Sequence, residues 1–163
     1  MTTKTNAGDA PADRTLVITR IFNAPRQLVW EAWTKKEHLE QWSCPRGMTM
    51  PESHGDLRVG GAWGFVMIAA DGEKFPCSGV YREIVPNERL VMTHGWLEDD
   101  GTRPHETVVT VSFEDAGAGK TKMTFEQSIF KSVKSRDDHN GGWSQCFDKL
   151  SELLAELETK EKS

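Results

Sequence analysis

Large apolar side chains recur at every second position in two segments of this 163-residue sequence. The first segment carries Trp63, Phe65 and Met67, and the second carries Met92, His94 and Trp96. Residues two apart along a strand share one face of the sheet, so each set predicts one broad, largely aromatic surface. Such rings offer a large contact area, and Trp adds an N–H that seeks a partner. The pattern fits the wall of a ligand-binding cavity, and ordinary core packing fits it equally well.

Three side chains are candidates for acid–base chemistry. His94 titrates near neutrality and is expected to point inward. Glu83 alternates with Tyr81, so the two are expected on one face, where an apolar pocket would raise the pKa of the carboxyl. The alternative for Glu83 is an ion pair with Arg58 or Arg82 that stabilises the fold. The alternative for His94 is a hydrogen-bonded position in the core.

Other types of chemical site find no support in the sequence. The five histidines show no H-x-x-x-H spacing, so we expect no metal, and no nucleotide-binding or nucleophile-elbow motif indicates a cofactor. Cys44, Cys77 and Cys146 lie far apart, which excludes a disulfide framework and is typical of reduced thiols. Cys44, next to Pro45, is the best candidate for a reactive thiol.

Charge and composition limit the choice of partner and compartment. The formal net charge is −5, which argues against nucleic acid as a partner, because phosphate binding needs a basic face. No run approaches the roughly 20 apolar residues of a membrane span, so no membrane association is expected. Residues 1–14 have no apolar run, so we predict a disordered tail rather than a signal peptide. Together these features predict a cytoplasmic protein.

The elements that must position these side chains begin with a strand at Thr15–Asn23, where β-branched residues are frequent. Pro25 is suited to the first turn of a helix. Apolar residues then recur at helical spacing as far as Trp42. We expect two short helices, bent at residues 34–36 and ending before Pro45.

From residue 47 to residue 130 the hydrophobic period is two, which predicts strands. Six are expected: Met48–Arg58, Ala62–Ala70, Glu73–Val85, Glu88–Leu97, His105–Asp115 and Lys120–Phe130. Turn signals such as Asp71-Gly72 separate them. Strands joined only by short turns form an antiparallel meander, and the lack of intervening helices excludes a parallel α/β fold.

One long helix is expected from Ser135 to about Thr159. Its apolar stripe consists of Trp143, Phe147, Leu150, Leu154 and Leu157. Asp137 or Asp138 is the expected N-terminal cap. The pair Gly141-Gly142 costs roughly 1 kcal/mol per glycine inside a helix. It indicates a close backbone approach or a kink beside a cavity, unless the helix begins directly after the pair.

These elements predict an α+β fold, formed by a single domain over residues 15–159. A seven-stranded antiparallel sheet with one apolar face must cover that face, and the long helix is the largest element available. The sheet is expected to curl around the helix and leave a cavity between them. Trp42, Trp143 and Phe147 would then join the two strand sets as ligand-binding residues, whereas Trp33 is assigned to the core.

Five blocks of the sequence carry a family resemblance. They read R-I-F-N-A-P-R-Q-L-V-W-E-A-W-T, H-L-E-Q-W, D-L-R-V-G-G-A-W, G-V-Y-R-E-I-V-P-N-E-R-L and H-N-G-G-W-S-Q-C-F-D-K-L. In this order they resemble the family named for the activator of the ninety-kilodalton heat-shock chaperone's ATPase. That family belongs to the START-like, polyketide-cyclase-like (SRPBCC) superfamily, so the resemblance implies a helix-grip fold. In this family an aromatic residue and a glycine often follow the position of Trp42, whereas this chain has Ser43-Cys44. The difference alters a loop near the expected cavity mouth.

Three functions are compatible with this resemblance, because the superfamily hosts several unrelated activities. The first is binding of a small hydrophobic or amphipathic ligand. The second is a cyclase- or hydrolase-type enzyme that uses His94, Glu83 or Tyr81, although no assembled catalytic motif supports it. The third is a stress-response interaction module like a co-chaperone, although the sequence itself does not support a chaperone partner. An exposed sheet edge makes a homodimer a further expectation.

Overall fold

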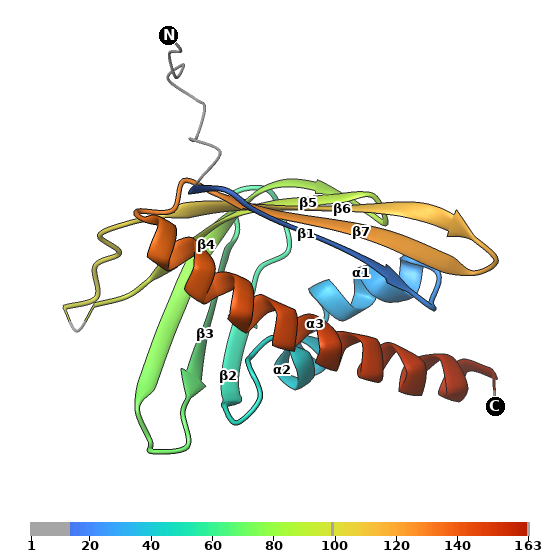
Figure 1. The fold of residues 1–163 in the computed structure, drawn as a ribbon, viewed down its shortest axis with the longest axis horizontal. Helices are drawn as coiled ribbons and strands as arrows, with labels where there is room; N and C mark the ends of the chain where they lie inside the picture. Colours follow the sequence, from blue (N-terminus) through green and yellow to red (C-terminus); the bar gives the residue numbers. More distant parts are fainter. Residues whose placement is uncertain (1–13, 99, 163) are drawn as a thin grey trace, which may run out of the picture.

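The computed structural model describes residues 14–98 and 100–162, and within them it contains seven strands and three helices (Figure 1). The strands are β1 (Leu16–Phe22), β2 (Thr49–Gly55), β3 (Ala62–Ile68), β4 (Lys74–Val85), β5 (Arg89–Trp96), β6 (Thr107–Gly117) and β7 (Lys120–Ser128). The helices are α1 (Arg26–Thr34), α2 (Lys36–Trp42) and α3 (Val133–Lys162). The tail expected at residues 1–14 lies, except for Arg14, outside the described residues.

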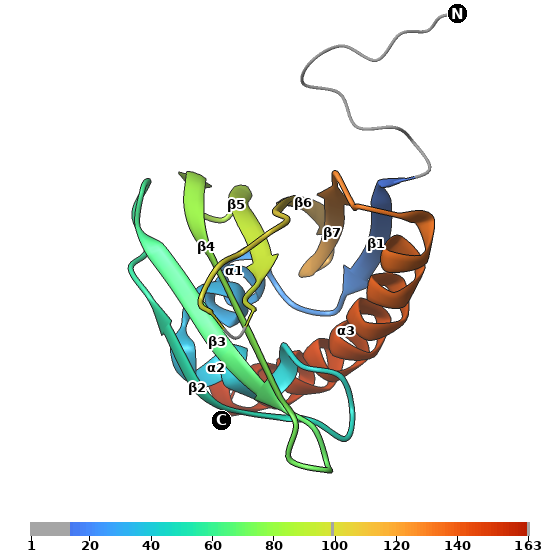
Figure 2. The same cartoon turned by 90° about the vertical axis from the view of Figure 1, so that its left-hand side faces the viewer.

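All described strands form one antiparallel sheet in the order β1-β7-β6-β5-β4-β3-β2. Strands β2 to β7 follow one another as hairpins, whereas β1 pairs with β7 at the opposite end of the chain, with Leu16 opposite Gln127. Figure 2 shows the sheet curving around the side that carries the helices. The predicted helix-grip architecture is therefore confirmed, with strand ends within a few residues of those expected.

Helix α3 supplies the main contact between the two layers. Its apolar stripe faces the sheet, and Phe147, Leu150 and Leu154 are buried. On its outer side, Arg20 of β1 donates to Asp148 of α3 at 2.8 Å. The stripe thus covers the concave face of the sheet, as its helical spacing predicts.

The start of α3 differs from the prediction. The helix begins at Val133, and the hydroxyl of Ser132 accepts a hydrogen bond from the backbone N–H of Ser135 at 3.0 Å. Ser132 therefore takes the capping role that was assigned to Asp137 or Asp138. Its short hydroxyl side chain directly precedes the first turn, whereas both aspartates lie inside the helix.

The short helices are held by aromatic contacts at their junction. The rings of Trp33 in α1 and Trp42 in α2 meet edge to face, with centroids 4.7 Å apart. The indole N–H of Trp42 donates to the backbone carbonyl of Ala32 at 2.8 Å. This fixes the predicted bend between the helices beside the open end of the curved sheet. In the part of the chain that the structure describes, no helix is both long and apolar enough to cross a membrane.

Candidate ligand-binding site between the sheet and the last helix

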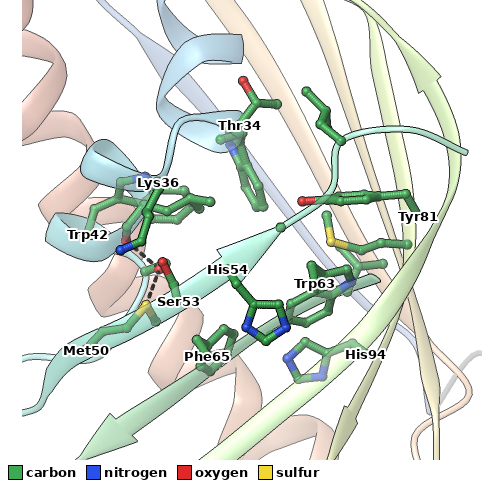
Figure 3. A pocket seen from close by; sticks show the side chains of 18 of the residues that line it. Thr34, Lys36, Trp42, Met50, Ser53, His54, Trp63, Phe65, Tyr81 and His94 are labelled. Atoms are coloured by element: carbon green, nitrogen blue, oxygen red, sulfur yellow. Dashed lines mark hydrogen bonds between the residues drawn. The ribbon is translucent and has the colours of Figure 1, made fainter. Parts of the chain in front are cut away.

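Two adjacent cavities lie among the described residues, between the concave face of the sheet and the helices. One has a volume of about 110 Å³ and the other about 490 Å³. Both are bordered by Ser43, Phe65, His94 and Trp143, so these four residues mark the junction between them. The smaller cavity, shown in Figure 3, lies under α1, α2 and β2, and the larger lies between the β3–β4 hairpin and α3.

Most of the residues expected to bind a ligand border one of these cavities. Trp42, Trp63, Phe65, Met92, His94 and Trp143 border the smaller cavity. Phe65, Met67, His94, Trp96 and Trp143 border the larger cavity. The two alternating strand sets, on β3 and β5 with β4 between them, therefore face the same space.

Phe147 is the exception, and its assignment to the ligand-binding wall is wrong. It is fully buried among the rings of Trp33, Phe125 and Trp143, and it is not among the described residues that line either cavity. One helical turn separates it from Trp143, which places it deeper in the core. Trp33 belongs to this aromatic cluster, as expected, but it also borders the smaller cavity.

Glu83 does not reach the cavity. The register between β4 and β5 shifts between Tyr81 and Glu83, so the two side chains no longer alternate regularly. Glu83 is exposed and accepts a hydrogen bond from the Arg89 guanidinium at 2.9 Å. The expected shared face with Tyr81 is therefore wrong. The ion-pair alternative is correct in kind, but the partner is Arg89 rather than Arg58 or Arg82.

Tyr81 points into the smaller cavity (Figure 3). The residue is 6 % exposed, and its hydroxyl has no hydrogen-bond partner among the described residues. Burial raises the pKa of the phenol, so it stays protonated at neutral pH and can donate. Gly55 of β2 leaves room for the hydroxyl, because any residue with a Cβ at this position would place that atom 3.3 Å from the hydroxyl oxygen.

A polar corner closes the smaller cavity on the side of α2. The carboxylate of Glu40 accepts hydrogen bonds from the Ser53 hydroxyl at 2.7 Å and from the Lys36 ammonium at 3.0 Å. The bond from Ser53, and then the one from Lys36, lower the pKa of Glu40. No motif predicts this corner, because its members come from a helix and a strand that share no sequence pattern.

Two indole N–H groups at the smaller cavity lack partners. Trp33 Nε1 and Trp63 Nε1 are buried and make no hydrogen bond within the described structure. A buried donor without a partner costs about 1–3 kcal/mol. Both residues border the same cavity as the Tyr81 hydroxyl. Because both indole nitrogens are inaccessible, the Tyr81 hydroxyl is the unpaired donor that a molecule in this cavity can reach among the described residues.

His94 lies at the junction of the cavities in a hydrogen-bonded network. The Trp143 indole N–H donates to Gln127 Oε1 at 2.8 Å, which orients the amide. The NH₂ group of the Gln127 amide then donates to Thr107 Oγ1 at 2.7 Å and lies 3.4 Å from His94 Nδ1. Because an amide NH₂ can only donate, His94 Nδ1 must be the acceptor. The other ring nitrogen, Nε2, carries the proton and lies 3.4 Å from Cys77 Sγ.

The surroundings of His94 keep the ring neutral. Burial, and then the charge of His139, lower the pKa of His94 to about 3. Burial also raises the pKa of the Cys77 thiol, which excludes a thiolate–imidazolium pair at neutral pH. A neutral ring with both nitrogens engaged favours the core-histidine interpretation over a general acid or base.

His139 has a role that sequence reasoning missed. The Trp96 indole N–H donates to His139 Nε2 at 3.0 Å, and His139 Nδ1 donates to the carbonyl of Ser135 at 2.7 Å. Burial lowers the pKa of His139, which preserves this neutral tautomer. The bond joins β5 to α3 across the larger cavity. The sequence feature that could have indicated this role is the position of His139 one helical turn before Trp143, on the same face of α3.

The larger cavity is apolar over most of its wall. The residues of its wall that the sequence did not predict include Pro45, Met48, Phe75 and Cys146. Gly142 lies inside α3, so the proposal that the helix begins after the glycine pair is wrong. A Cβ on Gly142 would lie 3.6 Å from Pro45 Cγ, which is ordinary contact. The glycine therefore borders the cavity, as the cavity interpretation of the pair expects.

Cys44 lies beside the larger cavity but is not exposed. It is buried, and the Lys149 ammonium donates to its backbone carbonyl at 2.9 Å and lies 3.6 Å from its sulfur. Cys44, Cys77 and Cys146 are all free thiols. Among the described residues, no three His, Cys, Asp or Glu side chains come together in a way that could hold a metal ion.

Gln127 gives a direct test of the network. We expect Gln127→Leu to lower the free energy of unfolding by about 1–3 kcal/mol, because the Trp143 N–H and His94 Nδ1 lose their partner inside the protein. Urea denaturation measures this loss. Glu126→Gln, an exposed neighbour on the other face of β7, should change the stability by less than about 0.5 kcal/mol. Equal stabilities of the two variants would contradict the network.

A curved antiparallel sheet that encloses a cavity against a long C-terminal helix defines the START-like, helix-grip class. A family model described as "Activator of Hsp90 ATPase homolog 1-like protein" matches residues 23–155. The chain therefore belongs to that family, as its sequence blocks predict. The fold is consistent with a ligand-binding domain. No match is found among curated proteins.

Solved structures support the same assignment. A protein from Nitrosomonas europaea is 26 % identical, with a TM-score of 0.77 over 91 % of this chain and 99 % of that chain. A protein from Chromobacterium violaceum is 26 % identical, with a TM-score of 0.79 over 86 % and 96 %. A Silicibacter pomeroyi protein, itself named for the family, is 26 % identical, with a TM-score of 0.79 over 86 % and 97 %.

Proposed function

We propose that this protein binds a small hydrophobic or amphipathic molecule in the paired cavities between the sheet and α3. The observation that carries the proposal is a pair of adjoining cavities bordered from several strands and helices by aromatic and Met side chains. The volume of about 490 Å³ in the larger cavity lies in the range of ligand pockets, roughly 300–1,000 Å³. The Tyr81 hydroxyl, which borders the smaller cavity and has no hydrogen-bond partner among the described residues, gives such a molecule a polar attachment point.

The enzyme alternative has less support. Glu83 is on the surface, and the His94 ring nitrogens are engaged within the protein. Tyr81 alone remains in the cavity with a free hydroxyl. A phenol whose pKa is raised is a hydrogen-bond donor at neutral pH, which suits binding better than proton abstraction.

A homodimer, a chaperone partner and a cytoplasmic location remain predictions from the sequence. Strands β1 and β2 are the two ends of the sheet, and β1 exposes Val17 and Ile21. Pairing of such edges between two chains is the physical basis for the homodimer prediction. Sedimentation equilibrium tests it, and a strictly monomeric protein at high concentration would contradict it.

Binding is tested with the neutral fluorescent probe N-phenyl-1-naphthylamine. We expect the probe to bind, and Trp63→Phe to weaken it about 3- to 10-fold, because a smaller ring removes apolar contact area from the cavity wall. Trp30→Phe is the matched control, since Trp30 is equally buried but packs on Phe113 away from both cavities. It should leave the probe affinity unchanged.

Two outcomes would overturn the ligand-binding function. One is absence of probe binding to the folded wild-type protein. The other is an equal loss of affinity in Trp63→Phe and Trp30→Phe, which would indicate a general effect on the fold. Native mass spectrometry of freshly purified protein, followed by solvent extraction, then identifies any molecule that is retained.

A further inference from the structure

We propose that the ligand is an uncharged amphipathic molecule with an oxygen acceptor, which receives a hydrogen bond from the Tyr81 hydroxyl while the apolar body extends past His94 into the larger cavity. This inference rests on the proposed function and specifies the chemical class of its ligand.

The Tyr81 hydroxyl is a donor without a protein partner. The residue is only 6 % exposed, and Figure 3 shows the hydroxyl directed into the cavity, near Gly55 of β2. Burial is the cause that raises its pKa, and no hydrogen bond to another group opposes the shift. A hydroxyl that faces the cavity without a protein partner can donate to a ligand acceptor, which adds a hydrogen bond to the apolar contacts.

The other hydroxyl groups around the smaller cavity are already engaged. Ser53 donates to Glu40 at 2.7 Å, Thr34 donates to the carbonyl of Trp30 at 2.9 Å, and Ser43 donates to the carbonyl of Leu39. Tyr81 therefore differs from them in having its donor free. The space beside it is kept open by Gly55, where a Cβ would come within 3.3 Å of the phenol oxygen.

The charges around the cavities favour an uncharged acceptor. Lys36 is the lysine that borders the smaller cavity, where the His54 imidazole also lies, and its ammonium pairs with the Glu40 carboxylate at 3.0 Å. At the larger cavity, the Asp138 carboxylate pairs with Lys134, and His139 is held neutral by its two hydrogen bonds. A carboxylate ligand next to Tyr81 would thus find no unpaired lysine or arginine among the described residues that line the cavities, which is unfavourable.

The larger cavity accepts the apolar part of such a molecule. Its wall is formed mainly by Met48, Met67, Phe75 and Trp96, with Cys146 from α3. Methionine side chains adapt to irregular shapes, which suits an apolar group of variable outline. Because the cavities adjoin at His94 and Trp143, one elongated molecule can place its oxygen in the first and its body in the second.

The experiment compares three fluorescent probes that share one ring system. They are 2-(dimethylamino)naphthalene, its neutral 6-propionyl ketone, and the anionic 6-carboxylate. We expect the ketone to bind at least 3-fold more tightly than the parent compound, and at least 10-fold more tightly than the carboxylate. Fluorescence titration gives the three dissociation constants, and the emission of the bound ketone reports hydrogen bonding to its carbonyl.

Tyr81→Phe removes the hydroxyl and keeps the ring. It should weaken the ketone about 3- to 10-fold, shift its bound emission to the blue, and leave the parent compound unchanged. Ser112→Ala is the control, because it removes a hydroxyl from the outer face of β6 and Ser112 borders neither cavity. It should change neither probe by more than 2-fold.

Each failure has a distinct meaning. If the parent compound and the ketone both fail to bind the wild-type protein, the proposed function itself is wrong. If both bind equally well and Tyr81→Phe affects neither, the ligand-binding function stands and the role of Tyr81 is refuted. If the carboxylate binds most tightly, the ligand class is anionic and the present inference is overturned.

Discussion

Leu150→Ala should lower the free energy of unfolding by about 2–5 kcal/mol, because Leu150 is fully buried at the centre of the α3 stripe. The lost methyl groups leave a void between α3 and the sheet that neighbouring side chains fill only in part. Urea denaturation, monitored by circular dichroism, measures the change. The loss is large relative to the 5–15 kcal/mol that typically stabilises a domain.

Leu157→Ala is the matched control for this prediction. Leu157 lies on the same stripe two turns further along and is only partly buried. Its truncation should therefore cost less than that of Leu150. A loss below about 1 kcal/mol for Leu150→Ala, or equal losses for both variants, would show that the stripe does not form the main contact with the sheet.

Acidification should destabilise the protein through His94. The pKa is about 3 in the folded protein and near 6.5 in the unfolded chain, so the unfolded state binds the proton more tightly. The contribution of His94 is fully present above pH 6.5 and is lost as the pH falls toward 3. The expected slope is about 1.4 kcal/mol for each pH unit in that window.

His94→Gln separates this effect from the titration of other groups. The variant keeps a polar side chain that can accept a hydrogen bond from Gln127, but it does not titrate. Its stability should fall less steeply than that of the wild type between pH 6.5 and pH 4.5, by roughly 2–3 kcal/mol in total. Parallel curves for the two proteins would refute the assignment of a neutral, buried His94.

The fold was predictable because its signals are local and periodic. The alternation that runs from Trp63 to Met67 can only serve a strand, and the 4-3-4-3 spacing from Trp143 to Leu157 can only serve a helix. Turn residues such as Asp71-Gly72 then set the hairpin order. The start of α3 was missed because Ser132 is an equally good cap and because packing on the sheet tolerates two glycines inside the helix.

The site was predictable only where it follows strand periodicity. His94 and Trp96 lie in the cavity wall because their strand has a regular register. Glu83 was misplaced because the bulge after Tyr81 changes the face on which the following residues lie, and no residue type announces such a bulge. The bond between Trp96 and His139 joins elements 43 residues apart, and therefore depends on tertiary packing.

The pairing of the first strand with the last has a consequence for how the chain folds during synthesis. Strands β2 to β7 pair with their neighbours in sequence, so they can assemble as each hairpin emerges from the ribosome. Strand β1 is made first but pairs with β7, with Leu16 opposite Gln127, and must wait for nearly the whole domain. Closing so long a loop is entropically costly. We therefore expect the nascent β1 to be the segment most in need of protection from aggregation.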